Sequence, residues 1–566
     1  MEQVIGGRLA AEALIEQGVK YVFTLSGGHI TPIYQFLEGS PVAIFDTRHE
    51  QAAVFMAEAW ARMIRKPAVA MVTAGPGFTN ALSGIANARL SNAPVVLIAG
   101  CVGLESAEKL DLQDMNQIPV IAPMVKKAWV CQVAERIPEF VDIAFRTAAA
   151  GRPGPVYLEL PCDVLNQAVD PARVRRPRSR VDSRPMDPEG AREILVMLQA
   201  AKSPVVVAGS GAWYADAGEA LRGFVERSGI PVFTGNSGRG VISDTHPLCF
   251  QSSLAIRPGA AFFTLASADL ILFLGSRLSL FYLFGELFRK DARFIQADIE
   301  AEEIGRNRSV DLGIVGDVRA LLEELNRVID AQGIGGSLQT GFQGWVETVR
   351  KADADGKAPT QPLWESDAVP IHPLRLAREV DAFMDRDDDI VVADGGDTQV
   401  WMAMTRTVRG GGRYFDSGLY GCLAVGLPFA NAAKLGHPES RVLLISGDGS
   451  IGFNFMEFHT AIRKGLPIVV VIANDQSWGM IAHSQTLRLG HSIPEGTSLG
   501  RVDYHRLVEV LGGFSALVER PEEIRPALAA AFASGRTACI NVMVDPAVIS
   551  PGSVALANLG GYCAKQ

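Results

Sequence analysis

The stretch Arg441-Val-Leu-Leu-Ile-Ser-Gly-Asp-Gly-Ser450 decides the fold, together with the later run Leu466-Pro-Ile-Val-Val-Val-Ile-Ala-Asn-Asp475. Residues 441–446 and 466–473 are short apolar runs, and the second is rich in β-branched residues, which is typical of buried strands. Between them, apolar side chains recur at helical spacing over residues 453–464. The three segments together predict a strand, a helix and a second strand of one parallel sheet.

Two carboxylates mark the ends of these predicted strands. Asp448 and Asp475 are separated by 26 positions, and in an open parallel sheet ligands bind at the carboxyl ends of the strands. Oxygen ligands suit Mg²⁺, which commonly shares them with a diphosphate. The glycines beside Asp448 let the backbone approach such a group, and the following helix offers free N–H groups. Gly-Asp-Gly alone is more often a surface turn, so the prediction depends on the pair.

This pattern resembles the metal-diphosphate motif of thiamine diphosphate-dependent enzymes of the acetolactate synthase-like superfamily. The resemblance implies thiamine diphosphate and Mg²⁺ as cofactors, with Asp448, Asp475 and the main-chain carbonyl of Ser477 as metal ligands. Members of the family more often have Asn at the second position. Asp475 adds a negative charge there, which makes a divalent cation more necessary.

Composition narrows the class of protein. The chain has 566 residues, 48% of them hydrophobic and 20% charged, so we expect a globular protein of two to four domains. No apolar run reaches 18 residues, which argues against a membrane span. The net charge of −9 argues against nucleic-acid binding. The N-terminus lacks the pattern of a signal peptide, and seven scattered cysteines fit a reducing compartment, so we expect a cytoplasmic protein.

Two polar, proline-containing segments, 170–190 and 351–372, are interpreted as linkers. Strand-like and helical runs alternate in the blocks that they separate, which predicts an α/β fold with a mostly parallel sheet flanked by helices in each of three domains. The family resemblance implies a pyrimidine-binding domain, a central domain and a diphosphate-binding domain. The boundaries that we predict are 1–170, 190–340 and 370–550, with a C-terminal tail at 551–566.

Glu50 is the candidate catalytic carboxylate. It lies in Ala43-Ile-Phe-Asp-Thr-Arg-His-Glu50, a predicted strand that leads into an amphipathic helix. This segment resembles the place where the family carries the Glu that hydrogen-bonds to N1′ of the cofactor's pyrimidine ring. A carboxyl group in an apolar pocket is suited to share a proton in this way. A lone Glu in the first turn of a helix could instead serve only the helix dipole.

The same resemblance implies a larger set of cofactor-binding residues. In the N-terminal part these are Gly28, Glu50, Thr73, Pro76 and Asn80. In the C-terminal part they are Gly396, Asp397, Thr398, Gly421, Leu423, Gly447, Asp448, Gly449, Ser450, Asp475, Ser477, Trp478, Gly479 and Met480. Leu423 corresponds to the apolar wedge that bends the cofactor, although its residue type fits an ordinary core leucine equally well. In this family the cofactor bridges two subunits, so the resemblance implies a homodimer as the minimum and a homotetramer as a common assembly.

Three stretches narrow the chemistry by resemblance to benzaldehyde lyase and 2-hydroxyacyl-CoA lyase-like proteins: residues 26–30, 46–50 and 474–479. By the same comparison Gln113 faces the substrate and His29 handles a proton, since His titrates near neutrality and Gln both donates and accepts. Such lyases cleave 2-hydroxy ketones or 2-hydroxyacyl-CoA, and in reverse they condense aldehydes or formyl-CoA. A His after two glycines can also be a turn residue. His49 and His483 are weaker candidates.

The chain departs from benzaldehyde lyase at Gln399 and Met480, so its substrate can be smaller than, or differently shaped from, the aromatic substrate of that enzyme. Gly-Met also occurs in acetolactate synthases, so acetolactate synthase or 2-ketoacid decarboxylase is the alternative activity. Residues 275–282 lack the charged pair of acetolactate synthases, which argues against FAD. Phosphates of CoA would need basic partners such as Arg277, Arg289 or Arg488. An inactive binding homologue is the remote alternative, disfavoured because Glu50 and both metal carboxylates are present.

Overall fold

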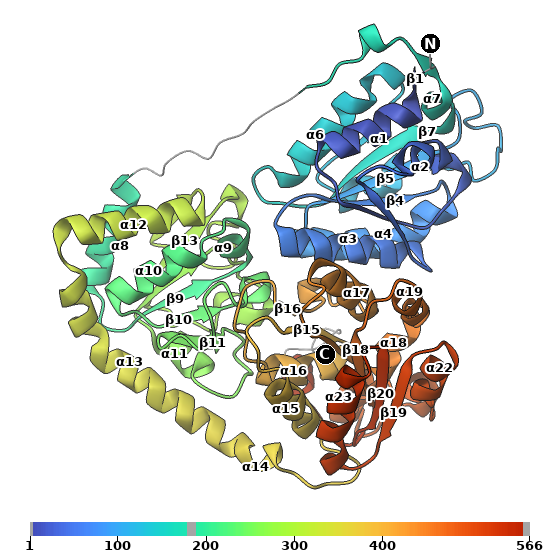
Figure 1. Cartoon of the computed structure of the whole chain (residues 1–566). Coiled ribbons are helices and arrows are strands. Elements are labelled where there is room, and N and C mark those ends of the chain that lie inside the picture. The colour runs from blue at the N-terminus through green and yellow to red at the C-terminus, as the bar shows by residue number, and fades with distance from the viewer. Residues whose placement is uncertain (1–3, 178–187, 559–566) are drawn as a thin grey trace. The chain divides into compact units, whose positions relative to one another are not determined.

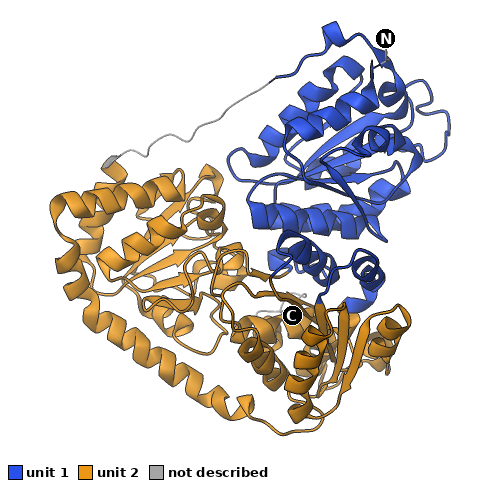
Figure 2. Ribbon diagram, in the orientation of Figure 1, with its two compact units in different colours: residues 1–181, 417–439, 451–468 blue, residues 182–416, 440–450, 469–566 orange. Residues whose placement is uncertain are grey.

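The computed structural model describes residues 4–177 and 188–558. These residues form three six-stranded parallel sheets, each flanked by helices, and one small antiparallel pair, β1 (Val4–Ile5) with β8 (Ala168–Val169) (Figure 1). The predicted fold class is therefore confirmed. The chain divides into two compact units, one formed by residues 1–181, 417–439 and 451–468 and the other by the remainder (Figure 2).

The first sheet belongs to the first unit and has the strand order β3-β2-β4-β5-β7-β6. Its strands are β2 (Tyr21–Thr24), β3 (Ala43–Asp46), β4 (Ala68–Val72), β5 (Val95–Cys101), β6 (Ala128–Val130) and β7 (Val156–Pro161). One face is covered by α1 (Gly6–Glu16), α2 (Thr31–Leu37) and α6 (Ile137–Ala149), whose apolar side chains share a core with the strands. The long helices α3 (Glu50–Ile64) and α4 (Pro76–Leu90) pack against each other beside strands β4 and β5.

Two further helices of the first unit come from the C-terminal half of the sequence, α17 (Gly426–Gly436) and α19 (Glu457–Arg463). Phe429 of α17 meets Phe55 of α3 edge-to-face at 6.1 Å between ring centroids, and the Arg62 guanidinium lies 5.4 Å from the same ring. Aromatic pairs and cation–π contacts of this kind add to the area that the helices bury. The packing of α3 on α17 thus ties distant parts of the sequence together.

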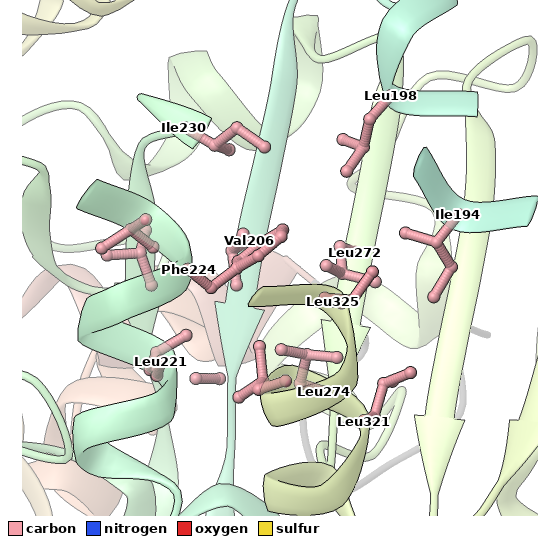
Figure 3. Close-up of a cluster of buried hydrophobic side chains, with 14 of the residues drawn as sticks. Ile194, Leu198, Val206, Leu221, Phe224, Ile230, Leu272, Leu274, Leu321 and Leu325 are labelled. Carbon is pink, nitrogen blue, oxygen red and sulfur yellow. The ribbon is translucent and has the colours of Figure 1, made fainter. Parts of the chain in front are cut away.

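The central sheet lies in the second unit, with the order β11-β10-β9-β12-β13-β14. Its strands are β9 (Pro204–Ala208), β10 (Val232–Thr234), β11 (Cys249–Ser252), β12 (Leu270–Leu274), β13 (Arg293–Asp298) and β14 (Leu312–Val315). Its helices are α8 (Pro188–Ala200), α10 (Gly218–Ser228), α11 (Ala261–Ser267), α12 (Val318–Gln332) and α13 (Gly335–Lys357). Successive strand residues point to opposite faces, so Val206 and Leu272 pack with α8, α10 and α12 (Figure 3), whereas Val207 and Phe273 pack with α11.

The third sheet, also in the second unit, has the order β16-β15-β17-β18-β20-β19. Its strands are β15 (Ile390–Asp394), β16 (Tyr414–Phe415), β17 (Val442–Gly447), β18 (Val469–Asn474), β19 (Phe514–Val518) and β20 (Ala538–Met543). The longer helices of this region are α15 (Pro373–Phe383), α16 (Gly396–Thr405), α20 (Gly479–Leu489), α23 (Ile524–Ala533) and α24 (Pro551–Asn558). Strands β15, β17 and β18 are neighbours, so their carboxyl ends meet at one edge.

The remaining helices are short. They are α5 (Ile118–Ile121), α7 (Cys162–Asn166), α9 (Ser210–Tyr214), α14 (Gln361–Trp364), α18 (Asp448–Phe453), α21 (Pro494–Thr497) and α22 (Tyr504–Val510). Within residues 4–177 and 188–558, the structure has no helix with the length and apolar character that crossing a bilayer requires.

The structure corrects two local predictions. The helix predicted over residues 453–464 begins later, as α19 from Glu457, because α18 ends at Phe453 and the chain turns at Asn454, whose side-chain amide donates to the carbonyl of Ala424. The linker predicted at 351–372 is mostly helical, since α13 continues to Lys357, where Lys357 pairs with Asp353 at 2.5 Å, and α14 follows at Gln361–Trp364. The non-helical connection is confined to residues 365–372. Part of the linker predicted at 170–190 lies outside the described residues.

Truncation of the central core should be costly. Leu272 is fully buried under α8 and α12 (Figure 3), so Leu272→Ala should lower the free energy of unfolding by about 2–5 kcal/mol through lost burial and an incompletely filled cavity. Val196→Ala, at a site 65% exposed on α8, should change it by less than about 0.5 kcal/mol. Urea unfolding followed by circular dichroism measures both, and equal effects would contradict the core assignment.

Candidate active site

In the first unit, the sequence-predicted residues gather where β2, β3 and β4 end. Glu50 is the first residue of α3 and follows β3 by four positions. The preceding residue, His49, caps this helix, since the N–H of Gln51 donates to its Nδ1 at 3.1 Å. His49 is therefore occupied by a structural role in this position. The cap fixes the start of the helix and with it the place of the Glu50 carboxylate.

Glu50 is only 6% exposed and its two oxygens differ in their surroundings. Asn80 Nδ2 donates to Oε2 at 3.0 Å, while Oε1 accepts no hydrogen bond from the residues that the structure describes. A Cβ placed at Gly77 would lie 3.5 Å from Oε1 and 2.7 Å from the Thr73 methyl group, so only glycine leaves this space open. The structure brings Glu50, Thr73 and Asn80 together and leaves one carboxyl oxygen available for a ligand.

His29 lies beside the same cluster. Its Nδ1 is 3.1 Å from the Thr73 hydroxyl, and its Cβ comes so close to Gly100 of β5 that a side chain there would be 2.5 Å away. Partial burial lowers the pKa of His29, against the opposing charge of Asp111. The imidazole is therefore neutral near pH 7, the form that can accept a proton at the ring nitrogen not bonded to Thr73.

Gln113 also reaches this region. Its backbone, with φ of +66°, runs so close to Gly75 that a Cβ on Gly75 would lie 2.9 Å from its side chain. Gly75 has φ of +57°, a conformation that favours glycine, so the loop of residues 73–76 is shaped by both constraints. Gly28 and Pro76 flank these residues at exposed positions. The residues predicted from the N-terminal part of the sequence therefore lie in one region.

Sequence reasoning missed the residue that fixes this loop, Gln117. It is 1% exposed, its Oε1 accepts from the N–H of Gly75 at 3.1 Å, and its Nε2 donates to the carbonyl of Gly100, the Tyr157 hydroxyl and the Glu159 carboxylate. A buried amide with every partner satisfied holds its neighbours rigidly. Gln117 lies four residues after Gln113. Because both are glutamines, residue type alone could not show which one holds the loop and which one faces the substrate.

In the second unit, Asp448 and Asp475 follow the neighbouring strands β17 and β18. Asp448 is 2% exposed, and its Oδ2 is buried without a hydrogen-bond partner among the described residues. Burial and the nearby Asp475 carboxylate raise the pKa of Asp448, and burial raises that of Asp475. Two such groups resist ionisation unless a cation offsets their charge. The N–H of Ser477 donates to Asp475 Oδ1 at 3.0 Å, which orders the following loop.

Closely packed glycines surround the two carboxylates. An added Cβ would lie 2.6 Å from the Trp478 ring at Gly449, 2.8 Å from Met480 at Gly396, and 2.3 Å from Asp475 Oδ2 at Gly479. Gly447 faces the Thr398 hydroxyl, and Ser450 is buried next to the same edge. The structure therefore brings together the predicted residues of the second unit. Within residues 4–177 and 188–558, no three His, Cys, Asp or Glu side chains form a ready-made metal cage, as expected for two carboxylates plus a carbonyl.

Asp397 was predicted to bind the cofactor, but its carboxylate is already surrounded by side chains of the protein. Its carboxylate accepts hydrogen bonds from Ser550 at 2.5 Å and Ser553 at 2.7 Å, and it contacts His483 Nδ1 at 2.5 Å. A ligand at the start of α16 would therefore meet its main chain rather than its carboxylate.

Gly421 and Leu423 lie in the first unit, in the segment before α17. Gly421 has φ of +68°, and Leu423 is half-buried. The wedge role of Leu423 stays a prediction. Of the arginines considered for CoA phosphates, Arg289 pairs with Asp291 at 2.9 Å.

The two clusters each lie at the carboxyl ends of parallel strands, where open α/β sheets bind ligands. Three family models match the chain: Thiamine pyrophosphate enzyme, N-terminal TPP binding domain (residues 5–120), central domain (191–325) and C-terminal TPP binding domain (394–542). Thiamine pyrophosphate is another name for thiamine diphosphate. The chain belongs to this enzyme family.

Curated relatives match along almost the whole chain. A probable acetolactate synthase of Mycobacterium bovis is 34% identical over 96% of this chain and 96% of the relative. A 2-hydroxyacyl-CoA lyase of Oryza sativa subsp. japonica is 31% identical, with 96% of each chain covered. A 2-hydroxyacyl-CoA lyase 2 of Homo sapiens is 30% identical over 97% of this chain and 92% of the relative. The family is thus clear, while the relatives carry two different activities.

Two glycines of α18, one in close contact with a neighbouring side chain and one not, allow the tight packing around the carboxylates to be tested. Gly449→Ala should lower the thermal midpoint of unfolding, because the new methyl group meets the Trp478 ring, and overpacking typically costs about 1–3 kcal/mol. Gly452→Ala, three residues on with no heavy atom within 4 Å, should leave it unchanged or raise it. Equal thermal midpoints for the two variants would contradict the close contact between Gly449 and the Trp478 ring.

Proposed function

We propose that this protein is a thiamine diphosphate- and Mg²⁺-dependent lyase and carboligase. It cleaves the C–C bond of 2-hydroxy ketones or 2-hydroxyacyl-CoA, and in reverse condenses aldehydes or formyl-CoA into acyloins. The observation that carries the proposal is His29, whose Nδ1 lies 3.1 Å from the Thr73 hydroxyl in the region of Glu50 and whose pKa burial lowers. A lyase needs such a group to take the proton from the substrate hydroxyl.

The residues around Asp448 fit a divalent cation and a diphosphate. The carboxylate pair and the partnerless buried Oδ2 of Asp448 supply hard oxygen ligands, and the carbonyl of Ser477 lies in the loop that Asp475 orders. The glycines leave the backbone open to an anion, and the first turn of α16 offers main-chain N–H groups and a favourable dipole. We therefore assign Mg²⁺ to Asp448, Asp475 and Ser477.

When bound, thiamine diphosphate supplies a nucleophilic carbon that adds to a carbonyl group and takes up the charge left by C–C cleavage. Glu50 shares a proton through Oε1, while Asn80 holds Oε2 and fixes the carboxyl plane. Burial of Glu50 keeps water from competing for that oxygen.

His29 and Gln113 act on the substrate. In the tautomer in which His29 Nδ1–H donates to the Thr73 hydroxyl, Nε2 is the free acceptor, so it can take the substrate's hydroxyl proton in the cleavage direction and return it in the joining direction. Gln113 offers both a donor and an acceptor to the substrate carbonyl and hydroxyl groups. Gln117 positions the loop of residues 73–76 against it.

Acetolactate synthase or 2-ketoacid decarboxylase is the second candidate. Two observations favour it. One is the 34% identity to a probable acetolactate synthase. The other is the pair Gly479-Met480, which resembles those enzymes and whose Met480 packs on Gly396. We also propose a cytoplasmic protein with a homodimer as the minimum assembly and a homotetramer as the common one, as the resemblance implies. Light scattering after size exclusion measures the assembly, and an active monomer would contradict it.

A substrate panel separates the two activities. Purified protein with Mg²⁺ and thiamine diphosphate is given benzoin, a 2-hydroxyacyl-CoA or pyruvate, with aldehyde and CO₂ both monitored. We expect aldehyde from a 2-hydroxy substrate without CO₂. Release of CO₂ from pyruvate with no cleavage of the other two would establish the second candidate instead.

Substitution of the carboxyl group tests its assigned role. Glu50→Gln should keep the fold and bind thiamine diphosphate, yet lower kcat by at least about 10²-fold, because an amide cannot share the proton. Exchange of the cofactor's C2 proton, followed by NMR, should slow in parallel. Glu38→Gln, on the surface after α2, is the control and should behave as wild type. Normal turnover by Glu50→Gln would remove Glu50 from the mechanism.

A further inference from the structure

Three carboxylates crowd one edge of the third sheet. Asp397 near the start of α16, Asp448 after β17 and Asp475 after β18 follow three neighbouring strands. Oδ2 of Asp397 and Oδ2 of Asp475 both lie within 4 Å of the position that a Cβ on Gly479 would occupy. Mg²⁺ can offset two of these charges but a diphosphate brings more, so the site carries an excess of negative charge around the anion that it is proposed to bind.

His483 of α20 contacts Asp397 of this cluster and has an acceptor at each ring nitrogen. Nδ1 is 2.5 Å from the Asp397 carboxylate, and Nε2 is 2.8 Å from the carbonyl oxygen of Pro546. With the Asp397 carboxylate ionised, neither partner has a proton to give, so each ring nitrogen donates and the ring is an imidazolium. The pKa of His483 agrees with this. Burial lowers it, but the hydrogen bonds to Asp397 and Pro546 raise it by more, so the pKa lies above its usual value.

We propose that His483 is a positioning residue of the diphosphate site, whose positive charge neutralises Asp397 and so permits an anion to bind beside three carboxylates. The inference rests on the proposed function, because it concerns the same cofactor. It assigns no direct contact between His483 and the cofactor. Its charge acts through Asp397, at the N-terminal turn of α16.

The same contacts join three parts of the second unit. His483 lies on α20, the helix that begins with Gly479 and Met480, while Ser550 and Ser553 at the start of α24 both donate to Asp397 Oδ1. The N–H of Ser553 donates in turn to Ser550 Oγ at 3.1 Å, which caps α24. Asp397 is therefore held by three donors, of which only His483 carries charge.

The test uses the full-length protein and measures cofactor affinity rather than turnover. Isothermal titration calorimetry of thiamine diphosphate into protein with saturating Mg²⁺ gives the Kd. His483→Gln keeps a side-chain donor and removes the charge, and we expect the Kd to rise by about tenfold or more. His246→Gln, a histidine that meets Glu226 in the central domain, is the matched control and should leave the Kd unchanged.

A double variant separates charge from packing. Asp397→Asn combined with His483→Gln removes one negative and one positive charge, so the affinity should return to within about threefold of wild type. A Kd for the double variant no better than that of His483→Gln would overturn the proposal, because the role would then be structural. So would an unchanged Kd in His483→Gln. If His483→Gln does not fold, a folded double variant with near-normal affinity supports the charge pairing, and failure of both variants to fold refutes it.

Failure of the proposed function gives a different result. Wild-type protein that binds no thiamine diphosphate in the presence of Mg²⁺ would remove the cofactor assignment, and with it the role of His483. Wild-type binding with an unaffected His483→Gln variant would remove the inference alone.

Discussion

Repulsion between two buried carboxyl groups is the constraint around which the second unit is organised. Asp448 and Asp475 follow adjacent parallel strands, and the register of β17 on β18 leaves neither free to move away from the other. Burial and mutual repulsion oppose their ionisation, and Oδ2 of Asp448 is unsatisfied among the described residues. Such an arrangement is costly for the fold alone. A divalent cation turns the same pair into a ligand set.

The first unit also buries a carboxyl group, that of Glu50, and supports it with a hydrogen bond. Glu50 is nearly as buried, but Asn80 supports one of its oxygens and a helix start lies beneath it. His29, Thr73 and Gln113 converge on the same edge because they follow different strands of one parallel sheet, the place where such sheets bind ligands. Gln117 keeps the loop between them in place. Each unit thus gathers polar side chains at the carboxyl ends of its parallel strands.

Much of this arrangement could be predicted from the sequence, and particular residues show why. The strands at 204–208 and 270–274 were readable as apolar runs bounded by polar turns, and their alternation with helices predicted parallel sheets. The Gly-Asp-Gly motif with Asp475 led to the second cluster because the ligand chemistry demands those residue types at strand ends. The late start of α19 at Glu457, where the spacing predicts a helix from residue 453, could not be predicted, since the turn before it involves Asn454 donating to the carbonyl of Ala424, which is distant in sequence. The partners of Gln117 and His483 are likewise distant in sequence, and only the tertiary structure brings them together.

The central claim is that the carboxylate pair binds the cofactor only through a divalent cation. The direct measurement is calorimetric titration of thiamine diphosphate into the wild-type protein and Asp448→Ala, each with Mg²⁺ and with a chelator instead. The account predicts that the wild type binds tightly with Mg²⁺ and at least about 10²-fold more weakly with the chelator, and that Asp448→Ala loses most of this metal dependence. Equal affinity with and without Mg²⁺ in the wild type would contradict it.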